Sequence, residues 1–133
     1  LGFVFTDAAV TAEALQTMLS SSVTVSYNRI TVDSDTSTSD TVLLFATGAA
    51  GNEPVTGPDS AHWAAFVDAL GEVNLSLAHQ IVRDGEGASK FVEVTVTGAE
   101  SDAGAKAIFG PGTNIPLAAS EVLGFIRRRR KAA

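Results

Sequence analysis

Two acidic side chains, two glycines and a lysine lie close together in the segment 84–91, DGEGASKF. The segment leads into an apolar run, 91–97, in which valines alternate with other residues as in a strand with one buried face. A carboxylate carried on glycine-rich backbone at a strand end can bind a cationic group of a substrate. A surface turn with ordinary charges explains the same residues, so both interpretations stay open on the chemistry alone.

Short hydroxyl and acidic side chains form a second candidate segment at residues 28–44, NRITVDSDTSTSDTVLL. Such side chains bond to their own backbone and fix turns. Asp33, Asp35 and Asp40 also suggest an oxygen-rich calcium loop. A loop beginning at Asp33 would, however, lack the glycine at its sixth position and the glutamate at its twelfth. The spacing therefore favours a structural turn, and we expect no metal site.

Together the two segments closely resemble the ornithine acetyltransferase family, also called the bifunctional glutamate N-acetyltransferase family. The resemblance is carried by the opening LGFVFTDAAV, by NRITVDSDTSTSDTVLLFATGAAG at 28–51 and by DGEGASKFVEVTVTGAESD at 84–102. It covers residues 1–102, and the order and spacing of the motifs make it more specific than any one of them. Ser34 stands where the family usually has Gly, and Ser39 where it usually has Asn. A residue that tolerates positive φ and an amide with two donors are thereby lost.

The resemblance implies a particular reaction. Family members are made as one precursor that cuts itself before a threonine, which becomes the N-terminus of the second, or beta, chain and the nucleophile. The terminal amine can act as base for its own hydroxyl, and the threonine carries acetyl from N-acetylornithine to glutamate in a ping-pong cycle. The first, or alpha, chain is expected to supply the oxyanion-stabilising groups. The implied partner is that alpha chain, in a cytoplasmic assembly of two alpha and two beta chains.

For this chain the resemblance assigns substrate binding to Glu86, whose carboxylate would accept hydrogen bonds from an ammonium group of ornithine. Lys90 could pair with Glu86 or orient it, or be an ordinary lysine at the start of a strand. Thr36 and Thr38 could lie near the site, although turn formation explains them equally well. No catalytic residue is assigned here. In the family the nucleophilic threonine is followed by Met and Leu, so the alignment places it upstream of Leu1.

The C-terminal part, 103–133, departs from the family pattern as a divergent turn-rich segment with a basic tail. The tail, Arg127–Lys131, holds five of the nine positive residues, which leaves residues 1–126 with four basic and fifteen acidic side chains and a net charge of −11. This change indicates a truncated or shifted reading frame, so we expect a beta chain that is incomplete at both ends. The alternatives left open are an inactive remnant serving as a structural or binding fragment and, more remotely, a self-cleaving amidohydrolase of similar fold.

Composition limits the other classes of function. The chain has no cysteine, which excludes disulfides and thiol catalysis. His62 and His79 have no partner motif, so we expect them on a helix surface or in packing. Neither a glycine-rich phosphate loop nor a dinucleotide fingerprint is present, so we expect no cofactor, and use of acetyl coenzyme A cannot be read from these residues. The acidic balance opposes nucleic-acid binding, and no apolar run is long enough to cross a bilayer.

The pattern of elements predicts an α/β (or α+β) fold, which the resemblance makes one of layered sheets flanked by helices and completed by a partner chain. We expect a helix after Thr11 with Leu15, Met18 and Leu19 as its apolar stripe. Residues 41–47 fit a strand or a short helix. The remaining expected elements are strands at 2–5 and 91–97, an extended stretch at 23–32, and a helix from Asp59 to about Val82. The stripe of that second helix is expected to be Trp63, Phe66, Val67, Leu70, Val73, Leu77 and Ile81.

Overall fold

The computed structural model describes residues 1–32 and 38–93. The chain divides into two compact units, one made of Leu1–Arg29 with Thr36–Gln80 and the other of Ile30–Asp35 with Ile81–Ala133. The elements in chain order are β1 (Gly2–Thr6), α1 (Ala12–Val25), a 3-10 helix (Tyr27–Arg29), β2 (Val42–Ala46) and α2 (Trp63–Arg83).

The two strands pair in parallel, with Gly2 opposite Val42 and Thr6 opposite Ala46. Because α1 lies between them in the chain, they form a β-α-β unit. The ambiguous stretch 41–47 is therefore a strand, and the α/β class expected from the sequence is confirmed. A hydrogen bond from the Gly2 amide to the Thr41 carbonyl, 2.9 Å long, extends the pairing at the start of β1.

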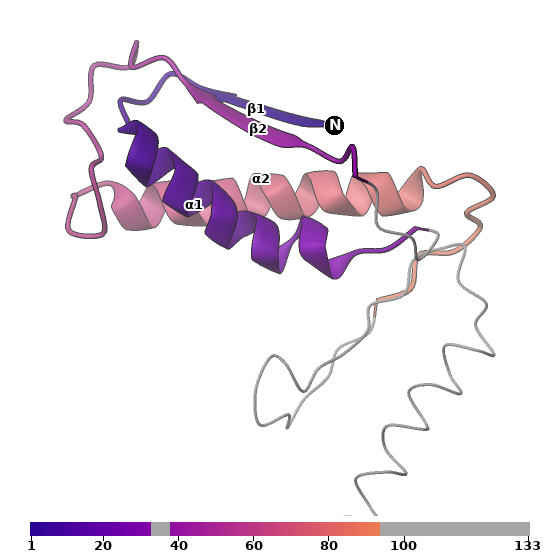
Figure 1. Ribbon diagram of the computed structural model, residues 1–133. Coiled ribbons are helices and arrows are strands. Elements are labelled where there is room, and N and C mark those ends of the chain that lie inside the picture. The colour runs from indigo at the N-terminus through magenta and orange to yellow at the C-terminus, as the bar shows by residue number, and fades with distance from the viewer. Residues whose placement is uncertain (33–37, 94–133) are drawn as a thin grey trace, which may run out of the picture. The chain divides into compact units, whose positions relative to one another are not determined.

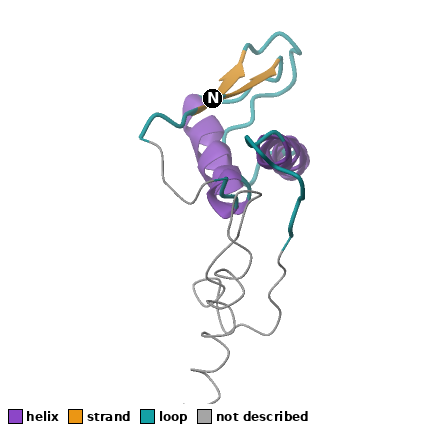
Figure 2. Cartoon of the chain, turned by 90° about the vertical axis from the view of Figure 1, so that its right-hand side faces the viewer, coloured by secondary structure: helices purple, strands orange, loops and turns teal. Residues whose placement is uncertain are grey.

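The hydrophobic core of the first unit lies between the sheet and the helices. Both helices lie on the same side of the two strands, as Figures 1 and 2 show from two directions. The fully buried centre consists of Met18 from α1, Leu70 from α2 and Val55 from the loop after β2. The partly buried residues packed against it are Val4, Val10, Leu44, Trp63, Phe66 and Val67.

Helix α1 begins as expected and ends later than expected. The Thr11 hydroxyl accepts a hydrogen bond from the Ala14 amide, which is the predicted N-cap. The expected extended conformation of 23–32 is wrong, because α1 continues to Val25 and the 3-10 helix follows. The Ser26 hydroxyl, buried with that residue, donates to the Ser22 carbonyl at 2.7 Å. This bond satisfies the buried hydroxyl at the end of the helix, and local contacts of this kind outweigh the strand propensity of the β-branched residues beside it.

Helix α2 begins at Trp63, so the expectation that Asp59 caps it is wrong. The residue that organises the turn is Ser60, whose hydroxyl accepts hydrogen bonds from the amides of Thr56 and Gly57. Its carbonyl then accepts from the Trp63 amide at 3.0 Å. This turn occupies the residues that the sequence assigned to the first helical turn.

The apolar stripe of α2 is confirmed in its first half and shifted in its second. Val73 and Ile81, expected to be buried, are 44% and 43% exposed. The buried side chains there are instead those of Asn74, Ala78 and Val82, which follow Leu70 at intervals of four. Residues at that interval form one ridge of a helix. The Asn74 amide nitrogen donates to the Ser22 hydroxyl at 2.9 Å and so ties this ridge to α1.

The expected strand 91–97 extends beyond the described residues. Its first three residues, 91–93, are described and have no regular secondary structure. The rest of the strand, like the segment 103–133, lies outside the described part of the chain, so both stay predictions.

Candidate functional site

The glycine-rich segment forms a tight loop directly after α2, in the second unit. The helix ends at Arg83, and the Ala88 amide donates to the Gly85 carbonyl at 2.9 Å to close a turn. Gly87 has a φ of +74°, a conformation that side-chain-bearing residues rarely adopt. Glu86 lies between the two glycines and is exposed, so its carboxylate faces solvent at the tip of a backbone turn.

The two motifs of the sequence meet at Gly85. A Cβ placed on this glycine would lie 3.0 Å from Cγ1 of Val32 and 3.5 Å from the Val82 carbonyl oxygen. The glycine therefore allows the loop to approach the start of the hydroxyl-rich segment closely. The sequence linked these two segments by resemblance only, and the structure brings Val32 and Gly85 together within one unit.

The other predicted residues have different outcomes. Thr36, Asp33 and Asp35 lie outside the described residues, so their roles stay predictions. Thr38 is exposed, and it belongs to the first unit rather than to the unit that carries Glu86. Lys90 is also exposed, and within the described part of the chain it forms no ion pair with Glu86. Its role beside Glu86 therefore gains no support from the loop geometry.

One contact at the base of the loop was missed by the sequence reasoning. The guanidinium carbon of Arg83 lies 4.8 Å from the centre of the Phe91 ring, a geometry in which a cation is attracted to an aromatic face. The two residues flank the loop on either side. A cation and an aromatic residue eight positions apart are too common in sequences to signal such a pair, so only the folded loop reveals it.

A second unpredicted feature is the phenol of Tyr27, in the first unit. Its hydroxyl is buried and has no hydrogen-bond partner among the described residues. Burial removes it from water and raises its pKa above the ordinary 10.0. A Cβ on Gly2 would lie only 3.1 Å from this hydroxyl, so the tyrosine packs over the first residue of β1.

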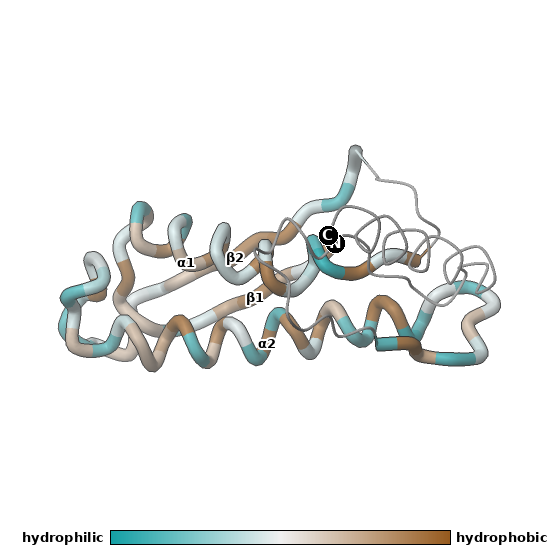
Figure 3. The backbone as a smooth tube through the Cα atoms, turned by 90° about the horizontal axis from the view of Figure 1, so that it is seen from below, coloured by the Kyte–Doolittle hydropathy of each residue, from teal (hydrophilic) through white to brown (hydrophobic). Residues whose placement is uncertain are grey.

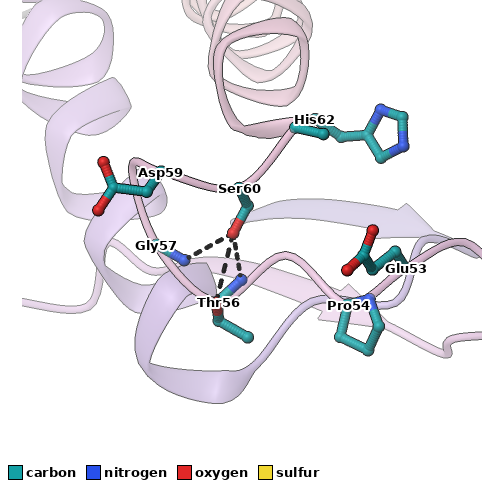
Figure 4. Close-up of a pocket in the computed structure, with 8 residues that line it drawn as sticks. Glu53, Pro54, Thr56, Gly57, Asp59, Ser60 and His62 are labelled. Atoms are coloured by element: carbon teal, nitrogen blue, oxygen red, sulfur yellow. Dashed lines mark hydrogen bonds between the residues drawn. The ribbon is translucent and has the colours of Figure 1, made fainter.

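A shallow pocket of about 800 Å³ lies at the turn before α2, also in the first unit. Asp59, Ser60 and His62 line it, a set that could suggest nucleophilic catalysis. Figure 4 shows the His62 ring and the Asp59 carboxylate pointing away from Ser60, whose hydroxyl is bonded to the turn. A catalytic serine needs a base within hydrogen-bond reach. The pocket therefore has a structural explanation, as the turn that starts α2.

Two further findings concern ions and membranes. Across residues 1–32 and 38–93, no group of three or more His, Asp or Glu side chains is placed to hold a metal ion. His62 is exposed and His79 is partly buried in α2. Among the helices that the structure describes, none has both the length and the apolar character needed to cross a membrane.

Comparison with known proteins gives consistent matches over nearly the whole chain. The ArgJ family model matches residues 1–118. The arginine biosynthesis bifunctional proteins ArgJ of Agrobacterium fabrum and Brucella suis are each 54% identical over 127 residues, covering 93% of this chain. The match covers 31% of each relative, so the chain spans about a third of the length of these proteins. The division expected at residue 102 stays a prediction.

The crystal structure of the arginine biosynthesis bifunctional protein argJ from Bacillus halodurans is similar in fold. The alignment has a TM-score of 0.75 and 49% sequence identity, and it covers 78% of this chain and 48% of the other. The fold, the sequence motifs and the matched relatives agree with the resemblance found in the sequence, which is thereby confirmed. The chain belongs to the ArgJ family.

Proposed function

We propose that this chain is part of an acetyltransferase of arginine biosynthesis that transfers acetyl from N-acetylornithine to glutamate. The family and the names of the matched relatives support the biosynthetic role. The observation that carries the assignment of a site is the packing of Gly85 against Val32, because it joins both family motifs behind the exposed Glu86. The reaction takes place in the cytoplasm.

The proposed reaction has two covalent steps. The hydroxyl of a threonine upstream of Leu1 attacks the acetyl carbonyl of N-acetylornithine, the amide bond breaks, and ornithine leaves with the proton on its new amine. The α-amine of glutamate then attacks the resulting ester and releases the threonine hydroxyl. The terminal amine of the threonine accepts and returns the proton, so neither step needs a cofactor.

Glu86 contacts an ammonium group of the substrate and does not contact the atoms that react. Its exposed carboxylate offers acceptors to an ammonium group, and hydrogen bonds between charged partners are shorter and stronger than neutral ones. The backbone of the loop is fixed by the Gly85–Ala88 turn and by Gly87, so the carboxylate is presented without a long flexible connection. This arrangement favours a substrate that carries a free ammonium group in addition to its acetylated nitrogen.

The rest of the enzyme is supplied by the alpha chain of the same precursor, in an assembly of two alpha and two beta chains. The apolar outer face of the sheet supports a partner. Phe3 and Phe5 are 51% and 70% exposed, and their neighbours Leu43 and Phe45 are 39% and 43% exposed. Sheets with parallel strands normally have both faces covered. Figure 3 shows hydrophobic colour along both strands. We propose that the partner chain covers this face.

Substitution of Glu86 tests the site. The variant is made in the complete enzyme, with both chains produced from the same precursor gene. Glu86→Ala should raise the KM for N-acetylornithine roughly 10- to 100-fold, because a hydrogen bond to a charged group is lost, and should change kcat less. Steady-state kinetics with N-acetylornithine as the varied substrate provides the measurement. Glu72→Ala removes an exposed carboxylate from α2 and serves as the control. A kinetic profile for Glu86→Ala equal to that of the control would remove Glu86 from the site.

A further inference from the structure

The loop that carries Glu86 is closed at its base by a contact between two residues that the family resemblance did not assign to the site. Arg83, the last residue of α2, precedes the loop, and Phe91 follows it. The Arg83 guanidinium carbon is 4.8 Å from the centre of the Phe91 ring. The contact therefore joins the two ends of the loop.

Inside the loop, two contacts of Gly85 fix the backbone. The Ala88 amide bonds to the Gly85 carbonyl, and Gly85 packs against Val32. Glu86, Ser89 and Lys90 are exposed. The position of the Glu86 carboxylate thus depends on the short Gly85–Ala88 turn and on the closure of the loop ends.

The choice of partner for Arg83 also matters for Glu86. An arginine three residues before a glutamate could pair with it, and such a pair would compete with a cationic substrate for the carboxylate. Within the described part of the chain, Arg83 and Glu86 form no ion pair, and the guanidinium lies over the aromatic ring instead. The planar guanidinium group is well suited to this stacking, more so than the ammonium of lysine.

We infer that Arg83 is a positioning residue for substrate binding: by stacking on Phe91 it holds the loop closed and keeps the Glu86 carboxylate available for an ammonium group. The inference rests on the proposed function of Glu86. It adds that the affinity for the acetyl donor depends on two residues, Arg83 and Phe91, that act through the loop and not by contact with the reacting atoms.

Two measurements on the protein expressed from its own gene test the inference. Hydrogen exchange of the amides at 84–90 reports the closure of the loop, and steady-state kinetics reports KM and kcat for N-acetylornithine. Arg83→Met and Phe91→Leu should each accelerate the exchange and raise KM roughly 2- to 5-fold, the range expected for an exposed cation–aromatic contact, with kcat little changed. Arg83→Lys, which keeps the charge, should recover part of both effects.

The control is Gln80→Met, which replaces another long exposed polar side chain on the last turns of α2. If Arg83→Met matches this control in exchange and in KM while Glu86→Ala raises KM, the inference is overturned and the proposed function stands. If Arg83→Met accelerates exchange but neither it nor Glu86→Ala changes KM, the loop contact exists without the positioning role, and the substrate role of Glu86 fails too. Faster exchange together with a raised KM in both variants supports the inference.

Discussion

At the scale of single residues, the chain buries polar groups in places where their partners are few. The Tyr27 hydroxyl has no hydrogen-bond partner among the described residues, and the same is true of the Asn74 side-chain oxygen. A buried polar atom without a partner costs about 1–3 kcal/mol. For Asn74 this cost is offset in part by its hydrogen bond to Ser22 across the two helices. Tyr27 has no such compensation, so its hydroxyl should be dispensable for folding.

Replacement of Tyr27 tests this directly. Tyr27→Phe should leave the free energy of unfolding at neutral pH unchanged or raise it by about 1 kcal/mol, because it removes the unpartnered hydroxyl and keeps the ring. The pKa of Tyr27 is raised by burial, so the folded state keeps the proton where the unfolded state loses it. Stability should therefore fall as the pH rises above about 10 in the parent, and fall less in Tyr27→Phe. Urea unfolding at neutral and alkaline pH measures both effects.

The close approach of Gly2 to the Tyr27 hydroxyl provides a control for the position of that hydroxyl. Gly2→Ala places a methyl group 3.1 Å from the Tyr27 hydroxyl and should destabilise the parent. In the Tyr27→Phe background the same change should cost less, since the nearest atom is gone. Equal costs in the two backgrounds would show that the hydroxyl does not lie where the structure places it.

At the scale of elements, one asparagine side chain links the loops that follow the two strands. After β1 and β2 end, the Asn52 side-chain oxygen accepts from the Ala9 amide at 2.7 Å. Its nitrogen donates to the carbonyls of Ala9 and Glu53 at 3.2 and 2.8 Å. A bridge between Val10 and Val55 follows directly. One asparagine therefore connects the two loops and leads Val55 into the core.

Loss of this asparagine should loosen both loops. Asn52→Ala leaves the Ala9 amide without its partner and should lower the free energy of unfolding by about 1–3 kcal/mol. Asn52→Asp keeps the acceptor oxygen but loses both donors, so it should cost less than Asn52→Ala. Thermal or urea unfolding compares the variants. If Asn52→Ala and the parent unfold alike, the loops are held by the Val10–Val55 bridge alone.

At the scale of the whole molecule, the first unit has a core on one face of its sheet and an apolar surface on the other. The rings of Phe5 and Phe45 stack on that outer face with centres 5.0 Å apart and planes 12° apart. Phe3 and Leu43 lie beside them in the register of the strands. Contiguous exposed apolar groups of this kind mark surfaces that bind other proteins.

This surface predicts how the chain behaves by itself. Expressed alone, it should self-associate and bind a hydrophobic fluorescent dye. Phe5→Thr combined with Phe45→Thr should reduce dye binding and association by roughly half or more, since aromatic side chains contribute most of the exposed apolar area. Leu75→Gln, which removes a single exposed leucine from α2, should leave both signals near the parent level. Light scattering and dye fluorescence test this, and equal signals from the two designs would contradict the role of the sheet face.

The sequence predicted the elements whose signals are local. Thr11 as a cap and the short apolar run at 2–5 identified α1 and β1. It failed where local hydrogen bonds between a side chain and the backbone decide, as for Ser26 at the helical end of α1 and for the turn that Ser60 builds in place of an Asp59 cap. Glu86 was assigned to the site through family resemblance, and its role stays a prediction. The approach of Gly85 to Val32 and of Arg83 to Phe91 depends on the folded backbone, so no pattern of residues could have indicated it.

The parallel register of the strands has a consequence for where chemistry can happen. The hydroxyl-bearing stretch 38–41 enters the sheet at the same edge as the first residues of the chain, because Gly2 is opposite Val42. Enzymes with open parallel sheets usually place ligands at the opposite edge, beyond the carboxyl ends of the strands. Under the proposed function, a nucleophile attached ahead of Leu1 works from the amino edge, where the Gly2 amide donates to the Thr41 carbonyl.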